Sequence, residues 1–370
     1  MTKLIDITGK AISGEWGAED EEGKGIPILR TTNFTNQGDV DFNNVVTRII
    51  KKKKIEEKFL RKGDIVIEKS GGSDKQPVGR VIYFDGPENT YLFNNFTGLL
   101  RVKDQTVWYP RYVFYSLFSN YRKGGTRMFE NKTTGLYNLK TADYISRYEV
   151  KEIDKFKQIK ICKQLDCMVR IIKTRQQELQ KLDELIQARF VEMFGDPIDK
   201  NKVNKYFIDC IEFNPKKTEV KDLKNKMASF VPMECVGTDG SFAIKEDGLI
   251  RDYYKGYTYF RNNDVLLAKI TPCFENGKVA IAEKCTNGIG FGTTEFHVLR
   301  PKIGISNSYW IKYVLKNEGV HNLAIINMTG SAGQKRIQTG FFEKLKIYLP
   351  PIDLQNQFAA FVQQITKSEI

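Results

Sequence analysis

The longest periodic stretch of the chain runs from Ile153 to Phe194 and contains neither Gly nor Pro. Its apolar residues recur every seven positions, which predicts one helix with a stripe for a partner helix. Gly195-Asp196-Pro197 then supplies a left-handed C-cap and a proline that ends the helix. At about 1.5 Å per residue the helix would span roughly 63 Å, so we interpret it as an exposed spacer. The alternative is a buried helix of one large domain. The stripe consists of Leu165, Ile172, Leu179, Ile186 and Met193.

Short apolar runs bounded by turn residues fill the first part of the chain. Such runs are typical of β-strands, and we expect strands at 26–29, 63–67 and 81–84. A helix is expected over 112–120. Strands and helices together indicate a folded α+β domain before the long helix.

The second part of the chain repeats the first at an offset close to 199 residues. Asp64 aligns with Asp264, Leu100-Arg101 with Leu299-Arg300, and Gln158-Ile159 with Gln357-Phe358. The predicted fold is therefore α+β, with two repeated α/β domains, each followed by a long helix. The helices are expected to pair as an antiparallel coiled coil whose distal member is truncated. The predicted parts are a first domain at 1–150, a central spacer helix at 151–197, a second domain at 198–350 and the start of the distal helix at 351–370.

Charge indicates a polyanionic partner. The net charge is +13, with +5 on residues 1–150 and +7 on residues 198–349, so both domains carry the surplus. The six cysteines form no C-x-x-C pair and only two histidines are present, so we expect reduced thiols and no metal site. The N-terminus does not read as a signal peptide and no apolar run is long enough for a membrane span, which favours a cytoplasmic protein.

Catalytic motifs are missing from the sequence. There is no G-x-x-x-x-G-K-[ST] phosphate loop, no G-x-S-x-G elbow and no H-E-x-x-H pair. Asn214-Pro215-Lys216-Lys217 lacks the second proline and the aromatic residue of an amino-methyltransferase motif. We therefore expect no catalytic residues and no cofactor in this chain.

The two-copy arrangement, the segment 264–278 (DVLLAKITPCFENGK) and the segment 349–357 (LPPIDLQNQ) resemble the DNA-specificity subunit of a type I restriction-modification enzyme. The resemblance covers essentially the whole chain. It implies two target recognition domains held apart by helices, which read a bipartite site in double-stranded DNA. It also implies partners, namely two methyltransferase (modification) subunits and restriction/translocase subunits. Their S-adenosylmethionine, ATP and Mg are expected in the partner subunits.

Polar and cationic loop residues are the candidate DNA contacts, because Lys and Arg attract phosphates and Asn, Gln, Ser, Thr and Arg can pair with base edges. Phe93, Phe96, Phe260 and Phe296 are interpreted as packing residues, and Asp64 and Asp264 as turn-capping residues. The candidates are Lys69, Ser73, Lys75, Gln76, Arg127, Lys132, Thr134 and Asn138 in the first domain, and Lys269, Thr271, Asn276, Lys278, Thr294, Ser331, Gln334, Lys335 and Arg336 in the second.

Two other functions fit part of the sequence. One is the recognition portion of a fused methyltransferase-endonuclease, which would need catalytic motifs that the sequence lacks. The other is a non-enzymatic coiled-coil scaffold with two protein-binding globules, which leaves the basic loops unexplained. Salt-dependent binding to duplex DNA would distinguish the scaffold from a DNA-reading protein.

Overall fold

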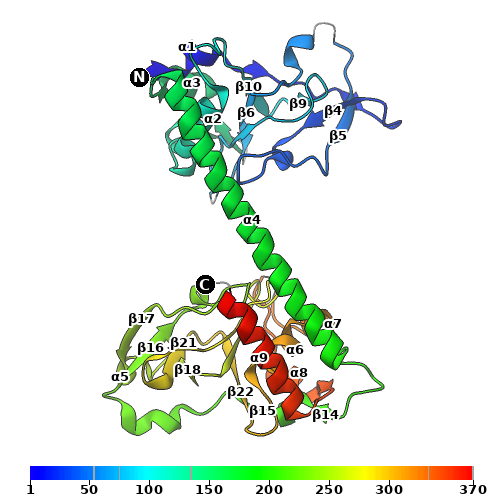
Figure 1. Cartoon of the computed structure of the whole chain (residues 1–370), viewed down its shortest axis with the longest axis vertical. Coiled ribbons are helices and arrows are strands. Elements are labelled where there is room, and N and C mark those ends of the chain that lie inside the picture. The colour runs from blue at the N-terminus through cyan, green and yellow to red at the C-terminus, as the bar shows by residue number, and fades with distance from the viewer. Residues whose placement is uncertain (53–54, 75, 134–135, 332, 369–370) are drawn as a thin grey trace. The chain divides into compact units, whose positions relative to one another are not determined.

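The computed structural model describes residues 1–370 except 53–54, 75, 134–135, 332 and 369–370. The chain divides into two compact units, Met1–Lys173 and Thr174–Ile370. Helix α4, Lys155–Phe194, is continuous across this division (Figure 1). The helix predicted over 153–194 is thereby confirmed, and Gly195 follows it with a φ of 73°, as a left-handed C-cap requires. The predicted domain boundaries stay predictions, because the division falls inside α4.

A central antiparallel sheet organises the first unit, and both of its faces are buried. Ile65 and Ile67 pack in one apolar cluster with α2 (Pro110–Arg122), whereas Val66 between them packs in another with Phe93. Because successive side chains of a strand point to opposite faces, a strand buried on both sides reads as a continuous apolar run. The strand order is β2 (Ile12–Ser13), β10 (Thr97–Leu100), β6 (Ile65–Glu68), β8 (Val81–Tyr83).

Two further sheets complete the first unit, together with one two-stranded pair and two short helices. The second sheet contains the parallel pair β4–β9. Its order is β3 (Ala18–Glu19), β5 (Val46–Ile49), β4 (Ile26–Leu29), β9 (Leu92–Phe93). The third sheet has the order β11 (Glu130–Thr133), β12 (Leu136–Leu139), β7 (Ser70–Gly71). The two-stranded pair is β1 (Thr2–Lys3) with β13 (Glu149–Val150), and the short helices are α1 (Leu4–Thr8) and α3 (Thr141–Arg147).

The second unit is built on the same plan. In its central sheet, Val265 and Leu267 pack in one apolar cluster and Leu266 in another, as in β6. Its second sheet also contains one parallel pair, β16–β21. The order of the central sheet is β15 (Ile211–Phe213), β22 (Phe296–Pro301), β19 (Val265–Ala268), β20 (Val279–Ile281), and that of the second sheet is β17 (Glu246–Leu249), β16 (Met227–Val231), β21 (Ile289–Gly292), β18 (Thr258–Arg261). A further pair joins β14 (Lys205–Tyr206) to β23 (Lys346–Ile347). The helices are α5 (Ile250–Tyr253), α6 (Ser308–Lys316), α7 (Glu318–Ile326), α8 (Thr339–Lys344) and α9 (Ile352–Ser368).

A buried aspartate closes the same turn in both units. Asp64 accepts a hydrogen bond from the backbone N–H of Arg61 at 2.8 Å, and Asp264 accepts one from that of Arg261 at 2.7 Å. The predicted turn-capping role is confirmed. Each carboxylate also accepts a second bond, at 2.8 Å, from the Nε of an arginine on the neighbouring strand, Arg101 or Arg300. The sequence had aligned these arginines without suggesting their partners.

A buried glutamine in the first turn of α4, and another in the first turn of α9, bonds to backbone carbonyls of the preceding chain. The amide of Gln158 donates to the carbonyls of Val107 and Ile153, at 3.0 and 2.8 Å. The amide of Gln355 donates in the same way to Ile305 and Pro350, at 3.0 and 2.9 Å. The sequence alignment of Gln158 with Gln357 was therefore wrong by two residues, because the run after Pro351 offers two glutamines and only the side-chain environment distinguishes them.

Helix α9 lies beside the last turns of α4 within the second unit (Figure 1). The ring of Phe358 lies 5.4 Å from that of Phe190 and 5.6 Å from that of Phe194, and Arg189 approaches Phe361. Residues later in α9 contact residues earlier in α4, so the two helices are antiparallel here. A coiled coil along the rest of α4 stays a prediction. None of the helices in the described ranges combines the length and apolarity needed to span a membrane.

Candidate nucleic-acid interface

The start of β7, where it pairs with β12, brings Lys69 and Asn138 together in the first unit, and we call this place the polar edge. The backbone N–H of Leu139 donates to the carbonyl of Lys69 at 2.8 Å, which continues the pairing of β7 with β12. Ser70 donates to the side-chain oxygen of Asn138 at 2.5 Å. The ammonium of Lys69 donates to Ser13 at 3.0 Å, and burial, followed by the charge of Lys58, lowers the pKa of Lys69. Two predicted contact residues thus share one edge, although 69 positions separate them in the chain.

The β11–β12 hairpin gathers further candidates at its exposed side. Tyr137 donates to Asp74, and the ammonium of Lys132 lies 4.9 Å from the centre of the Tyr137 ring. The Tyr137 hydrogen bond, followed by the charges of Lys132 and Arg127, lowers the pKa of the Asp74 carboxyl. The hairpin therefore places two predicted cations, Lys132 and Arg127, near the loop that carries Ser73.

A cationic hollow of about 590 Å³ adjoins this loop. Gln76 and Arg127 line it, as predicted contacts, and Gln76 donates across to Asn36 at 3.4 Å. Two exposed cations at the end of α2, Arg122 and Lys123, line it as well. Neither was among the candidates predicted from the sequence, although both directly precede Gly124-Gly125 and lie close to the candidate Arg127 in the chain.

The second unit repeats the edge with different side chains. The backbone N–H of Ile337 donates to the carbonyl of Lys269 at 2.9 Å, as Leu139 does to Lys69. Arg336 therefore occupies the position of Asn138, and its guanidinium forms an ion pair with Glu295 at 3.0 Å. That bond lowers the pKa of Glu295. The exposed candidates on the neighbouring turns are Thr294, Ser331, Gln334 and Lys335.

Three candidates of the second unit make other contacts. Lys278 donates to the carbonyl of Met233 at 3.0 Å, and Thr271 donates to Glu275 at 3.4 Å within its own turn. Asn276 lines a separate hollow that α4 also borders. Thr271 nevertheless lies beside Arg336, because its backbone N–H donates to the carbonyl of Lys335 at 3.0 Å. The side chains of Lys278 and Asn276 make their contacts elsewhere.

Lys75 and Thr134 lie outside the described residues. Phe93, Phe260 and Phe296 are buried, but Phe96 is 48% exposed, so its assignment as a packing residue was wrong. Phe96 lies in the turn between β9 and β10, where its carbonyl accepts the N–H of Lys69 at 2.8 Å and its ring points away from the core. In the second unit the N–H of Lys269 donates to the carbonyl of Glu295, so Glu295 is the counterpart of Phe96. The polar residue at this repeated position was the sequence signal that the position is exposed.

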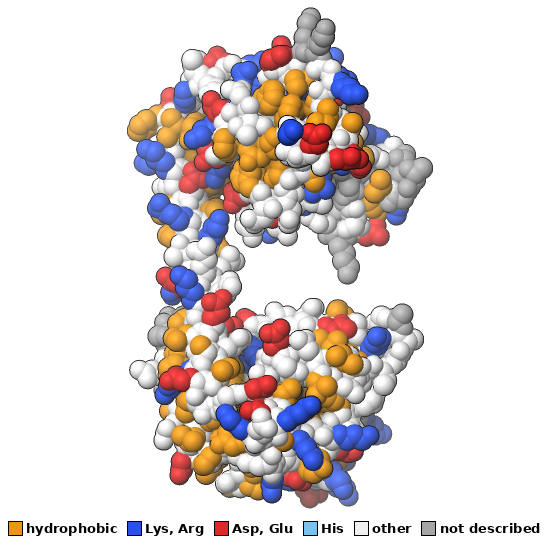
Figure 2. All heavy atoms as spheres, turned by 90° about the vertical axis from the view of Figure 1, so that its right-hand side faces the viewer, with side chains coloured by type: hydrophobic (Ala, Val, Ile, Leu, Met, Phe, Trp, Pro, Cys, Tyr) orange, Lys and Arg blue, Asp and Glu red, His pale blue; other side chains and the backbone are white. Residues whose placement is uncertain are grey.

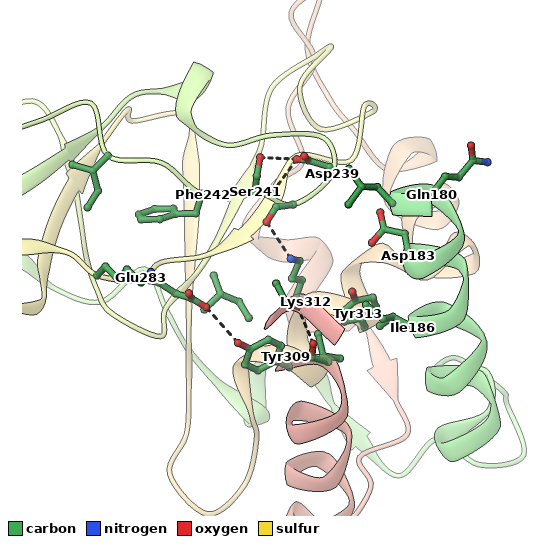
Figure 3. Close-up of a pocket in the computed structure, with 17 residues that line it drawn as sticks. Gln180, Asp183, Ile186, Asp239, Ser241, Phe242, Glu283, Tyr309, Lys312 and Tyr313 are labelled. Atoms are coloured by element: carbon green, nitrogen blue, oxygen red, sulfur yellow. Dashed lines mark hydrogen bonds between the residues drawn. The ribbon is translucent and has the colours of Figure 1, made fainter. Parts of the chain in front are cut away.

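Another hollow of the second unit, about 710 Å³, is lined by other residues (Figure 3). Asp183 and Ile186 of α4 line it, with α6, α9 and the loop at 239–244. Lys312 donates to the carbonyl of Gly240 at 3.1 Å, and burial lowers the pKa of Lys312 to about 8. None of the predicted contact residues lines this hollow. In the described part of the chain, no three His, Cys, Asp or Glu side chains are grouped to hold a metal ion.

Figure 2 shows Lys and Arg side chains on one face of each unit, interspersed with Asp and Glu. The fold and the edges define a class of protein: a tandem of two α+β modules connected through one helix, each with a polar edge rich in cations. Side chains of this kind can attract phosphates and pair with bases.

Comparison with known proteins finds similarity to one family. Residues 201–370 match the family described as "Type I restriction modification DNA specificity domain". The chain is 45% identical over 150 residues to the type I restriction enzyme EcoAI specificity subunit of Escherichia coli, and 47% identical over 145 residues to the EcoEI specificity subunit. These matches confirm the resemblance seen in the sequence.

The matches cover part of each protein. They span 40% and 37% of this chain, and 25% and 23% of the two Escherichia coli proteins. This chain also resembles the crystal structure of a type I restriction-modification S subunit from M. genitalium, with a TM-score of 0.55 and 14% identity. The matched region covers 99% of this chain and 89% of that subunit. This likeness concerns the fold alone, and it includes the first unit as well as the second.

Proposed function

We propose that the chain reads a bipartite sequence in double-stranded DNA as the specificity subunit of a type I restriction-modification complex. The observation that carries the proposal is the repeated polar edge, with Lys69 and Asn138 in one unit and Lys269 and Arg336 in the other. Two such edges provide two separate surfaces for hydrogen bonds to bases. The fused enzyme and the protein-binding scaffold are less well supported, because the matched relatives are specificity subunits.

The chemistry is proposed to reside in partner subunits. The chain itself is non-catalytic in this proposal. Two methyltransferase subunits supply the S-adenosylmethionine site, and restriction/translocase subunits use ATP and Mg. DNA binding by this chain directs those subunits to the target.

Non-specific attraction to DNA comes from the cations in this proposal. The hollow of the first unit carries Arg122, Lys123 and Arg127, all exposed and without an ion pair among the described residues. Each phosphate contact contributes about 0.9 to the slope of log binding constant against log salt concentration. A variant with all three cations changed to Gln should therefore lose roughly three units of slope if each contacts a phosphate.

The test measures binding of the full chain to mixed-sequence duplex DNA at several salt concentrations. We expect tight binding at low salt, with the smaller slope in R122Q/K123Q/R127Q. A control variant, K3Q/K10Q/K24Q, has the same net charge but changes exposed lysines outside the hollow. Equal slopes in the two variants would show that the hollow is not a phosphate site. No binding by the wild-type chain at any salt concentration, alone or with modification subunits, would contradict the proposed function.

A further inference from the structure

Arg336 is held in one orientation by hydrogen bonds from three of its N–H groups. Its Nε donates to Oε2 of Glu295 at 3.0 Å, and its Nη2 donates to Oε1 of the same carboxylate at 3.0 Å. Its Nη1 donates to the carbonyl of Gln334 at 3.2 Å. The guanidinium is planar, so these contacts fix the plane as well as the position of the group.

Two N–H groups of Arg336 stay available after these bonds. A guanidinium has five N–H donors, and three are used by Glu295 and Gln334. Glu295 binds the in-plane edge of the guanidinium that Nε and Nη2 form. The second N–H of Nη2 therefore lies on the edge that Nη2 shares with Nη1. The Gln334 carbonyl lies two residues before Arg336 in the chain, so we assign to it the donor of Nη1 that points back toward the backbone. The two free donors are then parallel and form a fork.

The backbone around Arg336 is fixed too. Arg336 forms bridges with Ile270 and with Thr329, and the next residue, Ile337, bonds to Lys269. His297 Nε2 lies 2.9 Å from the Ile337 carbonyl. The side chain of Arg336 is 36% exposed, so the fork lies at the surface although the residue is anchored. Ser331, Gln334 and Lys335 surround it as exposed polar groups.

We propose that Arg336 is a specificity-determining residue that reads a guanine in the major groove, with Glu295 as its positioning residue. Guanine presents O6 and N7 there as two adjacent acceptors, which a fork of parallel donors matches. Adenine presents one acceptor and one donor at these places, so the fork discriminates against it. This inference rests on the proposed DNA-reading function and names the base for one residue of the second unit.

The first unit presents a different group at the equivalent place. Asn138 occupies the position of Arg336, and exposed Phe96 occupies that of Glu295. The carboxylate-held fork therefore belongs to the second unit, and the guanine is expected in one half-site only.

The experiment selects DNA from a pool of duplexes with randomised sequence, using the full chain assembled with its modification subunits. Bound duplexes are sequenced for the wild type, R336K, E295Q and the double variant. R336K keeps the charge but lacks the fork, so we expect the preference for one guanine to fall about 10- to 100-fold while the other positions keep theirs. E295Q should weaken the preference at that same position. The double variant should be no worse than R336K, because Glu295 acts through Arg336.

Arg251→Lys is the matched control, because Arg251 is an exposed arginine beside a carboxylate, Asp252, in the same unit. It should leave every base preference unchanged. If R336K lowers affinity equally for all sequences, Arg336 contacts phosphate and the inference is wrong. If the position that loses its preference is not guanine, or if E295Q leaves it intact, the inference is also wrong.

Two outcomes separate this inference from other failures. A wild-type assembly that selects no sequence would overturn the proposed function itself. A loss of preference at many positions, together with a lower thermal unfolding midpoint in R336K, would assign Arg336 a structural role and overturn its reading of a base.

Discussion

His297 is a buried imidazole behind the edge that carries Arg336, and its protonation should control the stability of the second unit. It is 5% exposed, and burial lowers its pKa to about 4. The unfolded chain has the ordinary pKa of about 6.5, so it takes up a proton first as pH falls. The free energy of unfolding should therefore drop between pH 6.5 and pH 4, by about 3 kcal/mol in total. Urea unfolding of the wild type and His297→Gln from pH 7.5 to 4.5 measures this, and the difference between them should shrink at low pH.

The other histidine of the sequence provides the control for this prediction. His321→Gln keeps His297, so it should follow the wild-type pH dependence. Parallel curves for wild type and His297→Gln would show that the imidazole is not responsible.

Single residues also mark how far the sequence can predict. The turn-capping role of Asp64 followed from local pattern, because the hydrogen bond spans three positions. The ion pair of Arg336 with Glu295 joins residues 41 positions apart, and no local pattern contains it. Phe96 was misassigned for a related reason, since aromatic residues are usually buried and only its place in a turn exposes it.

At the scale of elements, the contact between α4 and α9 should depend on a few aromatic side chains. Phe358 is fully buried and lies 5.3 Å from the ring of Tyr313, in addition to its contacts with α4. Phe358→Ala should lower the free energy of unfolding by about 3–5 kcal/mol, because the surroundings cannot close the cavity completely. Phe156→Ala is the matched control on α4, since Phe156 is 76% exposed, and should change stability by less than about 0.5 kcal/mol. Equal effects of the two substitutions in urea unfolding would contradict this account.

Elements with a strong local signal were predicted well. The strands at 26–29, 63–67 and 81–84 correspond to β4, β6 and β8, and the helix at 112–120 lies within α2. The pairing of strands was not predictable in the same way. Whether β4 joins β9 in parallel depends on contacts between residues about 64 positions apart, and short apolar runs carry no information about their neighbours.

At the scale of the whole molecule, the two units should determine separate half-sites. Within the described ranges, the apolar clusters of each unit are made of residues of that unit alone. Under the proposed function, replacing residues 1–150 by the equivalent part of a known specificity subunit should therefore change one half of the recognised sequence and leave the other unchanged. Mapping the methylated sites in cells that carry the exchanged system measures this. A change in both halves would contradict independent reading.

The duplicated buried bonds have a consequence for the history of the chain. Apolar core positions can exchange one hydrocarbon side chain for another of similar volume, so two copies of a module drift apart there with little penalty. Asp64 with Arg101 and Asp264 with Arg300 offer no such freedom, because a buried donor or acceptor that loses its partner is destabilising by about 1–3 kcal/mol. After a duplication, directional bonds of this kind would be the last shared features to disappear. They still align at an offset near 199 residues, although the groups at the two edges have become as different as Asn138 and Arg336.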